Sequence, residues 1–471
     1  MATPGRAVGT AVVVVALVGA AYLTADAYDV VPGGITLAPV PADPNPFPTA
    51  PGASDAAQPA TAALLDLDPE APLPLAGAVQ SAVDQLAADP RLGPTTGVLV
   101  ADRLTGEVLA GHAPDDPRIP ASTAKLLTAA AALATLDPAA TLPTRVVAGG
   151  GGEIVLVGGG DMMLSGTTGD PSAVVGHAGL GDLAAQVAKG LALRGTTTVR
   201  LRFDDTLFTG PTTNAGWAAS DLNLGFVSPI TSLAVDLGRS SDATYAPAFT
   251  DPALAAAKDF AVRLGEAGIT VDGGPTRATA DPGAQVLGEV RSAPLGDVIA
   301  YDLAVSDNTV AEILSRLVAI EEGLPASFQG GTQAVLHAVG ALGVDTSGAR
   351  LADASGLADG SAIAPRTLVA VLAAATDGAH PRLRALATGI PIAGLTGTLA
   401  DRYTDSPARG EVRAKTGSLT GVTALAGTVV TADGRQLLFA VLADATPPGG
   451  QLAPRAAVDD FVSGLASCGC R

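Results

Sequence analysis

The clearest hydrophobic pattern lies near the C-terminus, where three apolar runs predict β-strands at 412–417, 422–430 and 436–443. The last two are separated by Ala432-Asp-Gly434, which is typical of a hairpin turn. Two shorter runs, at 97–102 and 107–111, predict a second hairpin far earlier in the chain. We therefore expect one antiparallel sheet that takes its strands from both ends of the chain.

Helical spacing of apolar residues recurs around these strands. Val79, Val83 and Leu86 predict a helix, and an alanine-rich run from Ser122 to Leu136 predicts another that Asp137-Pro138 ends. Helices are also predicted at 295–305, at 309–320 and at 455–465. The expected fold class is therefore α/β (α+β), an antiparallel sheet flanked by helices.

The middle of the chain has a different pattern. A glycine run at 149–152 and short β-like pieces such as 153–157 and 198–203 occur among predicted turns. We interpret 146–290 as an inserted, strand-rich domain. It separates a first part of the main domain, 75–145, from a second part, 291–467, and 468–471 form a tail.

The N-terminus predicts export. Arg6 precedes an apolar run from Val8 to Leu23, and Ala25-Asp26-Ala27 resembles a signal-peptidase site, so 1–27 is either a signal peptide or a membrane anchor. Residues 28–74 are rich in proline and alanine and predict a disordered linker. The remainder is expected to be secreted or held at the outer face of the cytoplasmic membrane, with membrane contact only through the N-terminal segment.

Charge and cysteine content exclude some functions. The chain of 471 residues carries 46 acidic and 27 basic residues, and this net charge of −19 argues against nucleic acid as a partner. The only cysteines, Cys468 and Cys470, could close a tight ring or be two thiols at the chain end, and we favour the thiols. No metal or other cofactor is predicted.

Three short motifs carry the candidate chemistry: Ser122-Thr-Ala-Lys125, Ser306-Asp-Asn308 and Lys415-Thr416-Gly417. The chain has only four lysines and four asparagines, so motifs built on these residues seldom arise by chance. Ser306 follows Ser122 by 306 − 122 = 184 residues, and the insert accounts for this spacing. The order Ser-x-x-Lys, Ser-x-Asn, Lys-Thr-Gly is that of penicillin-recognising enzymes with an active-site serine.

A serine hydroxyl needs a base, and Lys125, one helical turn after Ser122, is the local candidate. Free lysine titrates near about 10.4, so Lys125 needs a lowered pKa. The ammonium of Lys415, about 5 Å away in an effective dielectric of about 20, would destabilise the charged form of Lys125 by roughly 3 kcal/mol. Burial would supply the rest of the pKa shift. Ser306 would relay the proton and Asn308 would hold the substrate backbone.

The Lys415-Thr416-Gly417 strand would offer an edge to an extended peptide. Gly417 would allow close backbone approach there. The amide N–H groups of Ser122 and Ser418 are candidates for an oxyanion hole.

From about residue 75 to 467 the chain resembles the D-alanyl-D-alanine carboxypeptidases/endopeptidases of the class C low-molecular-mass penicillin-binding proteins. The further matching motifs are Val157-Gly-Gly-Gly-Asp161, Phe203-Asp-Asp-Thr-Leu-Phe208, Asp353-Ala-Ser-Gly-Leu357, Pro391-Ile-Ala-Gly394 with Gly397-Thr-Leu399, and Lys415-Thr-Gly-Ser-Leu419. The chain departs from the family at Ala354 and at Ala358-Asp359, in a loop that we expect to lie near the substrate and to affect its choice, and at Met162, where the family favours proline.

The resemblance implies that Ser122 is the nucleophile and Lys125 the base, with Ser306, Asn308 and Lys415 completing the catalytic set. It implies that Thr416 and Ser418, beside Gly417, bind the terminal carboxylate of the substrate. The implied reaction is acyl transfer from a peptidoglycan stem peptide to Ser122, loss of D-alanine and hydrolysis. The implied partners are stem peptides and, as inhibitors, β-lactam antibiotics.

Two alternatives stay open. A serine β-lactamase shares the three motifs, although the Glu-x-x-Leu-Asn element that would speed deacylation is missing from the sequence. A catalytically silent, wall-binding scaffold would have a broken Ser-x-x-Lys motif, and this one is intact. The sequence leaves open the balance of carboxypeptidase and endopeptidase action, the stem-peptide specificity and the oligomeric state.

Overall fold

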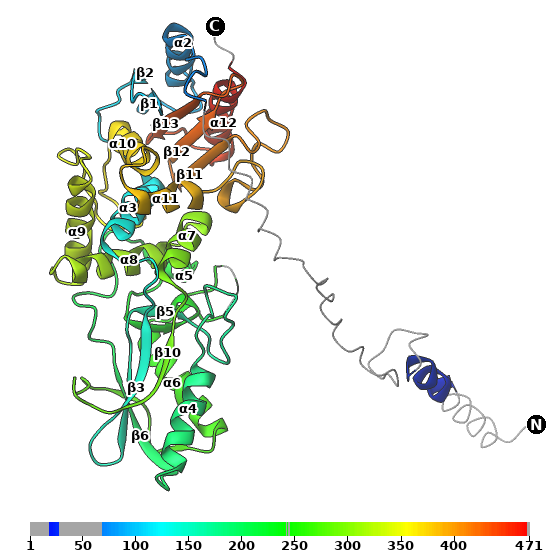
Figure 1. Ribbon diagram of the computed structural model, residues 1–471, viewed down its shortest axis with the longest axis vertical. Helices are drawn as coiled ribbons and strands as arrows, with labels where there is room; N and C mark the ends of the chain where they lie inside the picture. Colours follow the sequence, from blue (N-terminus) through cyan, green and yellow to red (C-terminus); the bar gives the residue numbers. More distant parts are fainter. Residues whose placement is uncertain (1–17, 28–67, 242, 244, 469–471) are drawn as a thin grey trace, which may run out of the picture. The chain divides into compact units, whose positions relative to one another are not determined.

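The computed structural model describes residues 18–27, 68–241, 243 and 245–468 (Figure 1). The chain divides into two units, Met1–Asp66 and Leu67–Arg471. In the first unit, residues 18–27 form a helix, while most of the predicted leader and linker lies outside the described residues. Among the described residues, no helix is both long and apolar enough to cross a bilayer.

The second unit is packed from its first described residues. Ala71, inside the predicted linker, is 5% exposed, and Arg435 donates hydrogen bonds to the carbonyl oxygens of Pro69 and Ala71. Packing thus starts a few residues before the predicted beginning of order at 75. At the other end, Cys468 is disulfide-bonded, so the expectation of two free thiols is wrong. Cys470 lies outside the described residues.

The main sheet has five antiparallel strands in the order β11-β12-β13-β1-β2. Their bounds are β1 Thr96–Asp102, β2 Val108–His112, β11 Val412–Leu419, β12 Val422–Val430 and β13 Gln436–Ala443. The pairing of β1 with β13 joins the two ends of the second unit, as predicted. The predicted antiparallel sheet with flanking helices is confirmed.

Both faces of the main sheet are buried, which explains why its strands are nearly continuous apolar runs. Val98, Val100 and Phe439 point into a core beneath α2 (Ala76–Ala87) and α12 (Leu452–Ser467). Leu99, Leu438 and their neighbours point the other way, into a core with the remaining helices. Those helices are α3 Lys125–Thr135, α7 Leu295–Val305, α8 Asn308–Glu321, α9 Phe328–Ala341, α10 Pro365–Thr376 and α11 Arg384–Gly389.

A second, mixed sheet with the order β10-β3-β4-β6-β8 lies at the lower end of Figure 1. Its strands are β3 Pro143–Ala148, β4 Glu153–Val157, β6 Thr198–Asp204, β8 Thr270–Val271 and β10 Val286–Arg291, and β9 Thr276–Arg277 also pairs with β6. Helices α4 (Leu180–Ala192) and α6 (Pro252–Glu266), which the sequence analysis did not predict, pack against it in a separate hydrophobic cluster.

Short elements complete the described part. They are β5 Asp161–Leu164, which pairs with β7 Leu233–Val235, the helix α5 Ala219–Asn223, and the 3-10 turns η1 Ala121–Ala124, η2 Asp236–Gly238, η3 Pro381–Leu383 and η4 Gly397–Leu399. The bounds predicted for the insert, 146–290, fall close to the span of the second sheet. They stay a prediction.

Candidate active site

Ser122 lies in the 3-10 turn Ala121–Ala124, and the α-helix predicted from the serine begins at Lys125. The tighter turn still places both side chains together, because the Lys125 Nζ atom donates a hydrogen bond to Ser122 Oγ at 3.0 Å. Ser122 also stands at the positive end of the helix dipole, where a developing negative charge is stabilised.

Two glycines from distant motifs enclose Ala121, the residue before Ser122. A Cβ on Gly417 would lie 2.7 Å from the Pro120 carbonyl oxygen, and one on Gly356 would lie 1.9 Å from the Ala121 carbonyl oxygen. The backbone approach that Gly417 permits is thus to the turn of the protein that contains Ser122. Ala121 has a φ of +44°, an unusual value for a residue with a side chain.

Lys125 is fully buried and has three hydrogen-bond partners. Its Nζ atom lies 2.6 Å from Asn308 Oδ1 and 2.9 Å from the Ser355 carbonyl oxygen, besides Ser122 Oγ. The two carbonyl-type oxygens can only accept, so they use two N–H bonds of the amine. When Lys125 is neutral, its lone pair is left for the Ser122 hydroxyl proton.

Ser306 terminates α7 in the left-handed conformation, with a φ of +64°. Asp307 then caps α8 by accepting the backbone N–H groups of Thr309 and Val310. This junction turns Ser306 Oγ toward β11, where Lys415 Nζ donates to it at 2.7 Å. All five predicted catalytic residues are therefore gathered in one place.

A buried loop supports Lys125 from behind, and the sequence analysis did not assign it this role. Asp353 accepts hydrogen bonds from Trp217 Nε1 and from the backbone N–H groups of Gly356 and Ala358. Glu312 Oε1, on α8, accepts the backbone N–H groups of Ala354 and Ser355, both at 2.9 Å. These bonds hold the Ser355 carbonyl against the Lys125 amine.

The same loop was expected to lie near the substrate. Residues 353–358 are not among those that line the pocket, and Ala354 and Ala358 are both buried. Ser355 of this loop contacts Lys125, and the expected effect of the loop on substrate choice stays a prediction. Ala354 and Ala358 alter the packing beneath the lysine, whereas Asp359 is exposed.

Burial lowers the pKa of both site lysines. For Lys125 desolvation is the largest cause, and it is opposed by the negative charges of Asp302, Asp353, Asp307 and Glu312. Burial also holds the pKa of Lys415 well below its usual range, and the nearby Lys125 ammonium lowers it further. The causes that act on Lys125 do not include the Lys415 charge, so the predicted lowering of the Lys125 pKa by Lys415 is not borne out. The repulsion lowers the pKa of Lys415 instead, and burial is the larger cause for both lysines.

Two buried carboxyl groups near the lysines were not foreseen. Burial raises the pKa of Asp302 to about 7, although the Lys125 and Lys415 charges lower it. Burial and the Asp353 charge raise the pKa of Glu312 to about 8. Neither side-chain oxygen of Asp302 has a hydrogen-bond partner among the described residues, so this carboxyl acts on the lysines through its charge.

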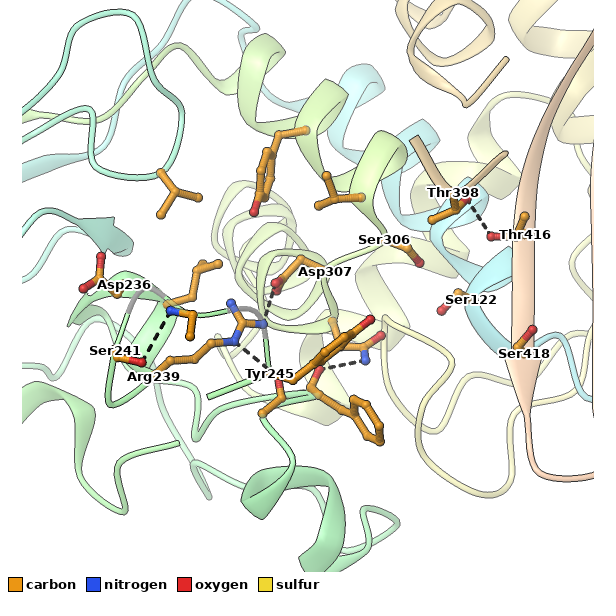
Figure 2. A pocket seen from close by; sticks show the side chains of 18 of the residues that line it. Ser122, Asp236, Arg239, Ser241, Tyr245, Ser306, Asp307, Thr398, Thr416 and Ser418 are labelled. Carbon is orange, nitrogen blue, oxygen red and sulfur yellow. Dashed lines mark hydrogen bonds and ion pairs between the residues drawn. The ribbon is translucent and has the colours of Figure 1, made fainter. Parts of the chain in front are cut away.

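The site opens into a cavity of about 770 Å³. Figure 2 shows Ser122, Ser306, Thr398, Thr416 and Ser418 at one end. The other end is lined by side chains from the segment between Gly225 and Tyr245, among them Asp236, Arg239 and Tyr245.

Backbone strain gathers around this cavity. Positive φ angles occur at Asp236, Leu237, Tyr245 and Ser306, which line it. Strained backbone of this kind persists where surrounding structure enforces it, and it clusters at functional sites.

The edge of β11 forms one wall of the cavity. Residues 391–393 pair with β11 at Arg413, where Ala414 donates its N–H to Pro391 and Ala393 donates to Val412. Beyond Ala414, no other strand of the described chain pairs with this edge. The free edge is where the sequence analysis placed an extended peptide.

Comparison with known proteins agrees with this arrangement. A family model described as the D-Ala-D-Ala carboxypeptidase 3 (S13) family matches residues 79–248 and 240–465. The chain belongs to this family. It is 38% identical over 481 residues to carboxypeptidase DacB of Mycolicibacterium smegmatis, covering 98% of this chain and 97% of that protein. It is also 38% identical over 408 residues to a carboxypeptidase of Mycobacterium tuberculosis, covering 84% and 85%.

Among solved structures, this S13 carboxypeptidase is similar to penicillin binding protein 4 (dacB) from Haemophilus influenzae. The TM-score is 0.70 at 25% identity, and the match covers 81% of this chain and 98% of that one. The resemblance to the low-molecular-mass penicillin-binding proteins is thereby confirmed, as is the enzyme class, a D-Ala-D-Ala carboxypeptidase. The findings favour this function over a β-lactamase or a silent scaffold.

Proposed function

We propose that the chain removes the terminal D-alanine from peptidoglycan stem peptides through an acyl-enzyme on Ser122. The peptide lies along the free edge of β11, and its penultimate carbonyl carbon is attacked by Ser122 Oγ. Neutral Lys125 takes the hydroxyl proton. The N–H groups of Ser122 and Ser418 stabilise the oxyanion, and water later hydrolyses the ester.

The observation that carries this proposal is the hydrogen-bonding of Lys125. Its amine is buried, has a lowered pKa and is fixed by two acceptors so that its remaining position meets Ser122 Oγ. A buried amine whose pKa is lowered and that lies within hydrogen-bond reach of a hydroxyl fits the requirements for a general base.

Ser306 and Lys415 form a second proton-carrying pair on the side of the leaving group. Ser306 Oγ accepts from Lys415 Nζ and can pass its own proton to the departing amine. Asn308 connects Lys125 to the cavity wall at Phe226, because its Oδ1 accepts from Lys125 while its Nδ2 donates to the Phe226 carbonyl oxygen at 2.9 Å. We assign Asn308 a role in holding Lys125 as well as the substrate backbone.

The proposal is tested on the wild-type protein by mass spectrometry. Incubation with benzylpenicillin is expected to add one penicilloyl group, which peptide mapping should find on Ser122. Incubation with a stem pentapeptide ending in D-Ala-D-Ala should release one D-alanine. A folded protein that forms no adduct and releases no D-alanine would overturn the assignment, and steady hydrolysis of penicillin would favour a β-lactamase instead.

We also propose that residues 68–468 act outside the cytoplasmic membrane, with 1–27 as the export signal or anchor. The support is the apolar run from Val8 to Leu23 after Arg6, together with a peptidoglycan substrate that lies outside that membrane. A fusion of alkaline phosphatase after residue 74 should be active in bacterial cells. It should lose activity when 1–27 are deleted, and equal activity without them would refute export by this segment.

A further inference from the structure

One end of the active-site cavity is lined by hydroxyl and guanidinium groups. Thr416 and Ser418 come from β11, and Thr398 Oγ1 lies 2.8 Å from Thr416 Oγ1 (Figure 2). Arg402 and Arg455 line the same end of the cavity from outside the three motifs. Arg455 lies in the first turns of α12, and one of its guanidinium nitrogens donates to Ser418 Oγ at 3.0 Å.

The charges of the two arginines differ in how they are balanced. Arg402 is bound by both carboxylate oxygens of Asp459. Among the described residues, no ion pair joins Arg455 to an acidic side chain. Burial and the neighbouring Arg402 charge lower the pKa of Arg455, and Asp459 only partly offsets them. This end of the cavity therefore has an uncompensated, partly desolvated positive charge, which an anion would stabilise.

The bond to Arg455 also orients Ser418. Since Ser418 Oγ accepts a guanidinium N–H, its own hydroxyl proton is free to donate to a second acceptor. An anion placed between the two side chains would accept from the Ser418 hydroxyl and from Arg455 at once. A guanidinium group suits this task because its planar N–H fork matches the geometry of a carboxylate.

We propose that Arg455 is a substrate-binding residue that selects peptides whose leaving residue carries a free carboxylate. This inference rests on the proposed function, because that function places the leaving D-alanine beside Ser418. Arg455, on the C-terminal helix α12, would bind the carboxylate together with the side chains that follow the Lys-Thr-Gly motif. The specificity for a free carboxylate is then set by a charge that lies outside the catalytic motifs.

The test compares two stem pentapeptides that differ only at the C-terminus, one with a free carboxylate and one with a carboxamide. For Arg455→Gln we expect kcat/KM for the carboxylate peptide to fall on the order of 10- to 100-fold, mainly through KM. The value for the carboxamide peptide should change little, so the preference of the wild type for the carboxylate shrinks. Arg455→Lys should restore part of that preference, because it keeps the charge.

The matched control is Arg91→Gln, which removes the same charge from a surface ion pair with Asp460 on α12. It should leave both kcat/KM values unchanged. If Arg455→Gln keeps the wild-type carboxylate preference, or lowers both values equally, the inference is overturned while the proposed function stands. If the wild type releases neither D-alanine from the carboxylate peptide nor D-alaninamide from the carboxamide peptide, the proposed function itself fails.

Discussion

Replacement of Ser122 by alanine is expected to abolish the penicillin adduct and to lower the rate of D-alanine release at least about 10⁴-fold. The adjacent hydroxyl, that of the buried Thr123, is not placed to substitute, because it is already bonded to the Pro120 carbonyl oxygen. The fold should be preserved, since Ser122 Oγ takes part in a single described hydrogen bond, from Lys125. Intact-mass spectrometry with benzylpenicillin and a D-alanine release assay measure the two effects.

Ser81→Ala is the control for this substitution, because Ser81 is exposed on α2 and bonds only to the Gly77 carbonyl oxygen. It should form the adduct at the wild-type rate. The Ser122→Ala protein should retain the wild-type melting temperature within a few degrees. An adduct that persists in it and maps to Ser306 would assign the nucleophile to the other serine of the site.

The strands of the main sheet could be predicted closely because burial of both faces removes polar residues from them. The predicted strands 422–430 and 436–443 match β12 and β13 residue for residue. The junction at Ser306 was equally clear, because the two apolar helical repeats end and begin on either side of it. By contrast, α4 and α6 were missed, since the short β-like pieces around them dominated the pattern of that region.

The supporting residues of the site could not be predicted for a different reason. The Ser355 carbonyl and the Lys125 amine are 230 positions apart, and no local pattern reports such a contact. Glu312 lies in an ordinary-looking helical repeat, and only the fold shows that its carboxylate is buried beneath the lysine. Arg455 likewise belongs to a helix with no motif. The three motifs indicated the candidate reacting groups, and contacts between residues far apart in the chain hold them in place.

Replacement of Lys125 by methionine is expected to slow acylation of Ser122 by at least about 10³-fold, because it removes the base while keeping a side chain of similar length. In the wild type, the acylation rate should rise with pH as Lys125 loses its proton. Burial lowers the pKa of Lys125, so this rise should occur well below the ordinary lysine value of 10.5. The residual rate of the variant should lack the rise. Lys189→Met, at an exposed position on α4, is the control.

Asp302 provides an independent check on the origin of that pH dependence. Its negative charge favours the ammonium form of Lys125 and thereby raises the pKa of the lysine. Asp302→Asn should therefore move the rise in acylation rate to lower pH, while Asp307, Asp353 and Glu312 still act on Lys125. A shift to higher pH, or a pH profile unchanged in both variants, would show that another group is the base. Stopped-flow measurement of penicillin acylation across pH distinguishes these outcomes.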